Sequence, residues 1–126
     1  MEAKPIFEAE IDAPRNLLRT HYRGHMTEPR FREAFGHFEG LLSQLKPGFT
    51  ILADMSELDL MELDCAPILG RIMDLCRASK VGTVVRVIPD PAKDIGVNIL
   101  SIVHYRGKVP IATFDSLEEA LKSLKG

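Results

Sequence analysis

This sequence has few cysteines, no large excess of either sign of charge and no long hydrophobic run. The two cysteines lack CxxC spacing, which suggests reduced thiols in a cytosolic protein. No apolar run approaches the roughly 18 residues needed to cross a bilayer. The N-terminus also lacks the basic region and hydrophobic core of a signal peptide. We therefore expect a cytoplasmic protein without a membrane span.

Neither sign of charge is in large excess, because 16 basic residues stand against 18 acidic ones, for a net charge of −2. The lysines and arginines are scattered, so the sequence has no electrostatic footprint for nucleic acid. A glycine-rich phosphate loop is missing as well, since Gly36 and Gly40 fall inside a predicted helix and Gly82 stands alone. We expect no nucleic-acid partner, and no motif indicates a nucleotide or other cofactor.

What the sequence does contain is typical of an ordinary globular domain. It has 126 residues, of which 45% are hydrophobic and 27% charged. A chain of this length is large enough to bury about two-thirds of its unfolded surface. We expect residues 1–126 to form a single domain.

The first two predicted elements are strands. Apolar and polar residues alternate from Ile6 to Ile11, which is typical of a strand with one buried face. Residues 12–16 have turn chemistry, and a second strand is predicted from Leu17 to Arg23, where Gly24 breaks it. These strands are expected to form an antiparallel β-hairpin.

A helix with a strongly apolar face is predicted next. Thr27 can cap it, with Glu28 and Pro29 in its first turn. Apolar residues then recur at intervals of three and four until Pro47-Gly48 stops the helix. The apolar positions are Phe31, Phe35, Phe38, Leu41, Leu42 and Leu45.

The chain is organised around the stretch from Phe49 to Ser79. Residues 49–53 are a short apolar run typical of a buried strand, which residues 54–56 close. After a loop, Asp64 stands where a helix N-cap is expected. Pro67 fits the first helical turn, because its missing N–H would have no partner there. The helix then presents one apolar face, and its solvent-facing N-terminus is where special chemistry is expected.

Four more elements complete the predicted order. The β-branched run Thr83–Ile88 indicates an interior strand covered on both faces. Asp94 can cap a third helix, and a short strand from Val109 to Phe114 contains a proline, which argues for a sheet edge. Ser116 and Glu119 form a capping box that opens a final helix. The order ββαβαβαβα predicts an α/β fold with a mostly parallel central sheet and an N-terminal antiparallel hairpin.

This element order and three short motifs resemble STAS domains, the family of bacterial anti-sigma factor antagonists and their relatives. Asp54-Met55-Ser56 is similar to the Asp-Leu-Ser that ends the family's central strand. Asp64-Cys65-Ala66-Pro67-Ile68 stands in place of the family's Asp-Ser-Ser-Gly-Leu, and Ile68-Leu69-Gly70-Arg71 follows it. The resemblance covers nearly the whole chain. It implies a STAS-like fold and a non-enzymatic signalling role through protein binding in the bacterial cytoplasm.

In that family, the first serine after the aspartate is phosphorylated by a partner kinase that is also an anti-sigma factor. Phosphate at a helix N-terminus beside an aspartate adds charge that can break a docked interface. Here Cys65 occupies the serine position and Ala66 follows it, so neither residue can become a phosphoserine. We expect an interaction module that is not phospho-switched, with an anti-sigma factor or kinase-like ATPase as the implied partner.

The expected binding surface is the N-terminus of the second helix with the preceding loop, roughly residues 54–68. Leu60, Met61 and Leu63 motivate this placement, because uncovered apolar side chains in a loop commonly mark a contact surface. The alternative is that they tuck into the core. The predicted interaction residues are Asp54, Ser56, Leu60, Met61, Leu63, Asp64, Cys65, Ala66 and Ile68.

Two other functions stay open. A thiol in the first turn of a helix feels the positive end of the dipole, which lowers its pKa, whereas Asp64 acts in the opposite direction. Cys65 is therefore also a candidate for a redox sensor or enzyme. A homodimer or small-ligand-binding protein could instead use the edge strand near Val109 or the Phe-rich helix.

The central loop is acidic, which raises the possibility of a cation site. Asp54, Asp59, Glu62 and Asp64 carry the carboxylate oxygens that Mg²⁺ and Ca²⁺ prefer. Their spacing is not that of an EF-hand, and capping with solvation explains them. We expect no metal in this loop.

Overall fold

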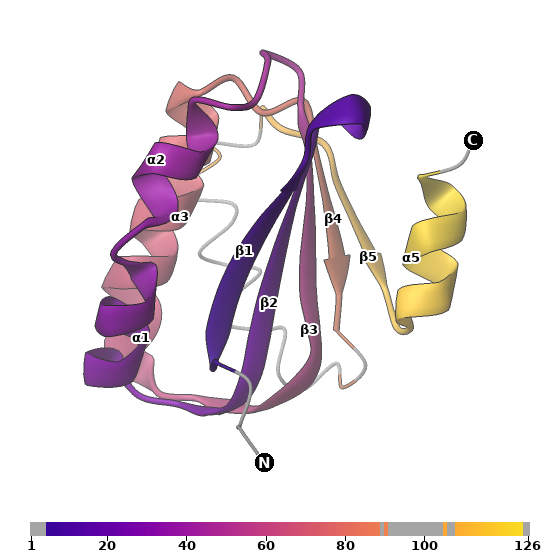
Figure 1. Cartoon of the computed structure of the whole chain (residues 1–126). Coiled ribbons are helices and arrows are strands. Elements are labelled where there is room, and N and C mark those ends of the chain that lie inside the picture. The colour runs from indigo at the N-terminus through magenta and orange to yellow at the C-terminus, as the bar shows by residue number, and fades with distance from the viewer. Residues whose placement is uncertain (1–4, 89, 91–104, 106–107, 125–126) are drawn as a thin grey trace.

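A five-stranded sheet forms the centre of the computed structural model, which describes residues 5–88, 90, 105 and 108–124. The strand order is β1-β2-β3-β4-β5 (Figure 1). β1 and β2 pair antiparallel, and each later pair of neighbours is parallel. The predicted α/β fold, with its hairpin and mostly parallel sheet, is confirmed. The strands are β1 (Phe7–Asp12), β2 (Leu17–Met26), β3 (Thr50–Met61), β4 (Thr83–Val87) and β5 (Ile111–Phe114).

The helices lie on two sides of this sheet. α1, α2 and α3 cover one face, and α5 lies apart from them near β5 (Figure 1). The helix predicted after Asp94 lies outside the described residues. Within the described ranges, no helix has the length and apolar character to cross a membrane. The helices are α1 (Glu28–Phe35), α2 (Phe38–Leu42), α3 (Ala66–Ala78) and α5 (Leu117–Ser123), with 3₁₀ turns η1 (Ala13–Arg15) and η2 (Leu63–Cys65).

The larger core fills the space between the sheet and α1, α2 and α3. Phe7 on β1 lies at its centre, with ring centroids 5.3 Å from Tyr22 and 5.1 Å from Phe31. Tilted aromatic pairs at this separation add to the stabilisation that comes from burying their area. Phe31 and Phe38 are both buried, so the predicted apolar face of this helical region is confirmed.

A smaller core lies on the opposite face, under α5. Leu17, Leu52 and Val85 alternate along their strands with residues of the larger core, so they point to the other side of the sheet. Ala120 of α5 packs against them. Ser116 caps this helix, since its Oγ accepts a hydrogen bond from the Glu119 N–H at 3.2 Å. β4 is buried on both faces and β5 lies at the edge, as predicted.

The predicted single helix after Thr27 is two short helices. α1 ends at Phe35 and α2 begins at Phe38, with Gly36 and His37 between them. Thr27 holds the N-cap position, as predicted, but no side-chain cap hydrogen bond is found for it among the described residues. Gly36 lacks the side chain that would favour helix, which accounts for the interruption at this point.

β2 is longer than predicted, because Gly24 does not break it. The strand continues to Met26, and its pairing with β3 shifts register between His21 and Arg23 and again between Gly24 and His25. Gly24 has φ of +65°, a left-handed conformation that a glycine adopts without the penalty a Cβ brings. The hydrogen-bond ladder between β2 and β3 is therefore irregular near Gly24, but β2 continues as a strand.

β3 is also longer than predicted, and Asp64 is not the helix N-cap. The stretch after Ser56, expected to be a loop, continues as strand to Met61, because the extension of β2 supplies its hydrogen-bonding partner. Asp64 lies within η2, and the N-cap of α3 is Cys65, with no side-chain cap bond found in the described part of the chain. Pro67 does lie in the first turn of α3, as predicted.

Candidate interaction surface

The far end of β3 turns directly into α3, and one carbonyl of β2 holds this turn in place. The Met26 carbonyl oxygen accepts a hydrogen bond from the Glu62 N–H at 3.0 Å and a weaker one from Cys65 Sγ at 3.5 Å. The Cys65 N–H donates in turn to the Glu62 carbonyl at 2.9 Å. Residues 62–65 are therefore tied to the end of β2, and η2 has a defined orientation.

Two leucines, one at the end of β3 and one on this turn, point into solvent. Leu63 is 88% exposed and Leu60 is 52% exposed, and they are the exposed large hydrophobic residues among those described. Met61 behaves differently, since it is half-buried and packs against the larger core. Of the three apolar side chains predicted at this surface, two are exposed and Met61 is partly buried. We call Leu60 and Leu63 the leucine pair.

Acidic residues are next to the leucine pair in the sequence. Asp59, Glu62 and Asp64 are all exposed. Glu62 Oε2 lies 2.8 Å from Nε2 of His25, which is exposed at the end of β2. The surface therefore combines apolar side chains with a mainly negative rim, an arrangement common at protein interfaces.

Cys65 points into the core and not toward solvent. Its exposed fraction is 0%. Burial raises the pKa of the Cys65 thiol, and the neighbouring carboxylates of Glu62, Asp64 and Glu28 raise it further. Asp64 therefore opposes thiolate formation, as the sequence suggested, but burial is the larger cause. The Cys65 side chain thus offers no atom to solvent.

The remaining residues predicted near the start of α3 divide between core and surface. Ile68 is buried in the larger core, and Ala66 is half-buried. Asp64 is exposed beside the leucine pair. Of the predicted residues from 60 to 68, Leu60, Leu63 and Asp64 are exposed, whereas Met61, Cys65, Ala66 and Ile68 are wholly or partly buried.

Asp54 and Ser56 belong to a different part of the molecule. Asp54 is 5% exposed, and its Oδ1 accepts hydrogen bonds from the Ser56 N–H at 2.9 Å and the Ser56 hydroxyl at 2.6 Å. Its Oδ2 lies 3.6 Å from Nδ1 of His21 on β2. The nine predicted site residues thus fall in two places, the turn after β3 and the middle of the sheet.

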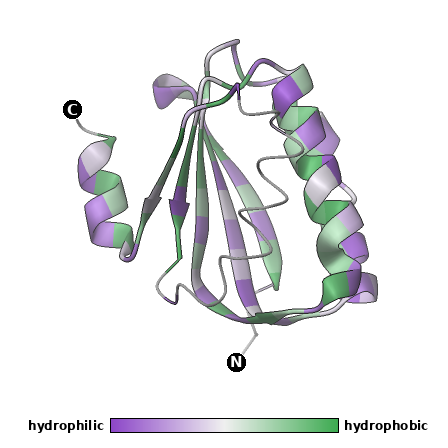
Figure 2. Cartoon of the chain, turned by 180° about the vertical axis from the view of Figure 1, so that it is seen from behind, coloured by the Kyte–Doolittle hydropathy of each residue, from purple (hydrophilic) through white to green (hydrophobic). Residues whose placement is uncertain are grey.

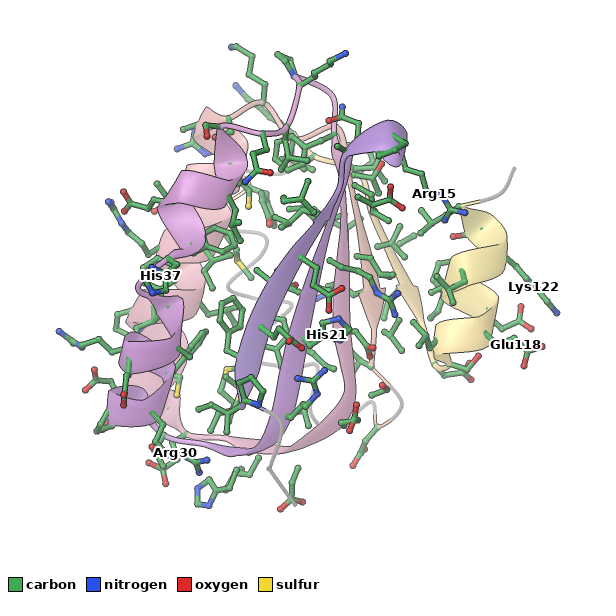
Figure 3. The ribbon with its side chains drawn as sticks, in the orientation of Figure 1. Arg15, His21, Arg30, His37, Glu118 and Lys122 are labelled. Atoms are coloured by element: carbon green, nitrogen blue, oxygen red, sulfur yellow. The ribbon has the colours of Figure 1, made fainter. Side chains whose placement is uncertain are left out.

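Sequence reasoning missed the polar group that Asp54 joins. His21 lies between Asp54 and Glu10 in the structure, and Glu8 is close to both Glu10 and His21 (Figure 3). The alternation of Glu8 and Glu10 along the first strand did place them on one face. Their meeting with His21 depends on the hairpin register, which pairs Glu8 with His21. That register was not predicted.

Comparison with known proteins confirms the fold. No family model matches the sequence. No curated protein matches it. The structure is similar to that of an uncharacterised DUF3478-family protein with a SpoIIAA-like fold from Shewanella loihica PV-4. The TM-score is 0.65 at 17% sequence identity, over 94% of this chain and 91% of that one. The SpoIIAA-like fold is the STAS fold, so the resemblance in element order is confirmed at the level of architecture.

Proposed function

We propose that this chain is a non-enzymatic protein-interaction module, comparable to an anti-sigma factor antagonist of the bacterial cytoplasm. It binds its partner through the turn between β3 and α3. The observation that carries this proposal is the exposure of the leucine pair, 52% for Leu60 at the end of β3 and 88% for Leu63 on the turn that the Met26 carbonyl holds. The STAS-like fold supports it, because the resemblance implies binding at this same end of the molecule.

The energetics of the leucine pair favour a binding role. Fully burying a leucine side chain contributes about 1.5–3 kcal/mol. The fold does not obtain this contribution from Leu63, which makes no core contact in the described structure. Because hydrogen bonds to Met26 already orient the turn, a partner would not have to order it on binding.

The charges predict the chemistry of the partner. A complementary surface would have an apolar pocket for the leucine pair and basic side chains facing Asp59, Glu62 and Asp64. We propose an anti-sigma factor or kinase-like ATPase as the partner class. Because Cys65 is buried and its thiol carries no hydroxyl, regulation of this contact does not use phosphorylation at that position.

The first test removes the leucine pair. The double variant L60S/L63S should keep the wild-type circular dichroism spectrum and melting temperature, because both side chains are exposed. Pull-down from the native cell extract with the wild-type chain should recover a kinase-like ATPase or anti-sigma factor, and the double variant should lose it.

A matched control carries two changes on an exposed face elsewhere. E118A/K122A alters α5, which lies well apart from α3 (Figure 1), and should recover the partner as the wild type does. Undiminished recovery of the partner by the folded L60S/L63S variant would refute the proposed surface.

A homodimeric or ligand-binding role is the second candidate. An open groove of about 440 Å³, lined in its described part by Arg15, Leu17, Thr50 and Leu124, favours it. Such a volume is in the range of small-molecule sites. Phe31 and Phe38 of the Phe-rich helical region are not available for dimerisation, because they are buried in the chain's own core. Sedimentation velocity over a range of concentrations separates a dimer from a monomeric module.

A further inference from the structure

Three potential metal ligands meet on the sheet face opposite the larger core. Glu8 and Glu10 lie on β1 and His21 lies on β2, with Glu8 directly opposite His21 in the antiparallel register. One ligand atom from each residue lies within 4.8 Å of the other two. Because alternate residues of a strand share a face, Glu8 and Glu10 point to the same side as His21. Figure 3 labels His21 near the middle of the sheet.

The His21 ring is buried and lies between carboxylates. It is 9% exposed, and its Nε2 has no hydrogen-bond partner in the part of the chain that the structure describes. Nε2 lies 3.4 Å from Glu10 Oε1, and Nδ1 lies 3.6 Å from Asp54 Oδ2. Both ring nitrogens thus face a carboxylate oxygen, and Nε2 is left open on the side of Glu10.

The separation of these atoms suits a transition-metal ion. Zn²⁺ binds imidazole nitrogen and carboxylate oxygen at about 2.0–2.2 Å, and a tetrahedron of that size has ligand atoms about 3.3–3.5 Å apart. The distance of 3.4 Å between His21 Nε2 and Glu10 Oε1 matches one such edge. Because Glu10 is exposed, water can reach a remaining coordination position.

Three further residues define the surroundings of the site. Asp54 faces the opposite ring nitrogen, as carboxylates commonly do behind metal-binding histidines, and Ser56 orients Asp54. Arg23 Nη1 donates to Glu8 Oε1 at 3.1 Å, which leaves the second oxygen of Glu8 for a metal. The positive charge of Arg23 also weakens the attraction of the carboxylates for a cation, so the choice of metal ion depends mainly on the imidazole ligand. This favours Zn²⁺ and similar ions over Mg²⁺ or Ca²⁺.

We propose that Glu8, Glu10 and His21 bind one divalent transition-metal ion, with Asp54 positioning the histidine. The ion links β1 to β2 across the hairpin. The site is independent of the proposed interaction surface, since it shares no residue with the turn after β3.

Isothermal titration of the full chain with Zn²⁺ tests this proposal. The wild type should bind one ion per chain. E10Q should weaken binding at least tenfold without harming the fold, because Glu10 is exposed. H21Q should weaken it about a hundredfold or more, and D54N about tenfold to a hundredfold through loss of the supporting carboxylate.

The matched control is H25Q. His25 lies on the same strand but is exposed and already pairs with Glu62, so this variant should bind Zn²⁺ as the wild type does. Because H21Q removes a buried side chain, NMR of the wild-type imidazoles gives a second measurement in which the His21 ring signals shift on addition of Zn²⁺. Absence of binding, equal affinity in E10Q, or unshifted His21 signals would each overturn the proposal.

Discussion

Burial determines the chemistry of both cysteines. Cys65 and Cys76 each have an exposed fraction of 0%, and burial raises the pKa of both thiols, for Cys76 to about 12. Both thiols are therefore protonated at neutral pH, whereas a reactive cysteine is present as a thiolate at that pH. This favours a packing role for Cys65 over the redox or enzymatic role that its position at a helix start left open.

The raised pKa of Cys76 predicts that the protein loses stability in alkaline solution. The unfolded thiol ionises near its ordinary pKa of 9.0, while the folded one stays protonated until about 12. Stability is thus complete below pH 9 and falls as the pH rises above it. Between pH 8 and 10 the loss from Cys76 should be about 1.4 kcal/mol.

Urea unfolding at several pH values measures this loss. The variant C76A is expected to be less stable at every pH, because it leaves a small cavity, but its stability should fall less steeply between pH 8 and 10. The same slope in C76A and the wild type would contradict the assignment. Measurements stop at pH 10 because burial also raises the pKa of Tyr22 and Tyr105, which would add their own effects at higher pH.

At the residue scale, the candidate surface was partly predictable from sequence. Leu60 and Leu63 stand out because apolar residues alternate there with acidic ones. Cys65 and Ile68 were included for their positions in a motif, and the structure buries both. A motif gives the order of residues along the chain but not which of them face the core. That depends on how α3 packs on the sheet.

At the scale of elements, a close approach of two glycines fixes the start of β3 against the start of β4. The Gly82 N–H donates to the Phe49 carbonyl at 2.7 Å, and the Gly48 N–H donates to the Lys80 carbonyl at 2.7 Å. A Cβ on Gly82 would lie 2.6 Å from the Gly48 carbonyl oxygen. Backbone on both sides leaves no flexible group to move aside.

We predict that G82A destabilises the protein by about 2–3 kcal/mol, because the loops before β3 and β4 must move apart. The matched control is G40A in α2, where an added Cβ has nothing within 4 Å. That change should be neutral or stabilise by about 0.5–1 kcal/mol, as alanine favours helix over glycine. Urea unfolding of the two variants measures the difference. Equal stability of G82A and G40A would contradict the tight contact.

Sequence reasoning placed the described strands and helices in the correct order but not all of their ends. The errors concentrate where long-range pairing overrides local preference. Residues 56–61 contain serine, glutamate and aspartate, which favour loops, yet they form strand because the end of β2 pairs with them. Apolar spacing continued across Gly36, so the interruption between α1 and α2 was missed.

At the scale of the whole molecule, the two faces of the sheet differ in what covers them. α1, α2 and α3 cover one face, while on the other side α5 packs against residues of β2, β3 and β4. Figure 2 shows the hydrophilic residues along the strands. Glu8, Glu10, Arg23 and His21 lie on the same side of the sheet as α5 but are not part of the small core beneath that helix.

The interaction surface and the metal-ligand group lie at different points along β2. His21 of the metal-ligand group lies in the middle of β2, five residues before Met26, whose carbonyl holds the turn after β3. At about 3.3 Å per residue, these positions are roughly 17 Å apart along the strand. The two proposed sites therefore do not contact each other directly.

Site-specific photo-crosslinking in cells tests the central claim most directly. A photoreactive amino acid replaces Leu63 in one protein and Lys122 on α5 in another, since both side chains are exposed. We predict that position 63 crosslinks to a different protein of the kinase-like ATPase or anti-sigma class and that position 122 does not. Crosslinks from position 63 only to copies of this chain, or the same products from both positions, would contradict the proposed interaction surface.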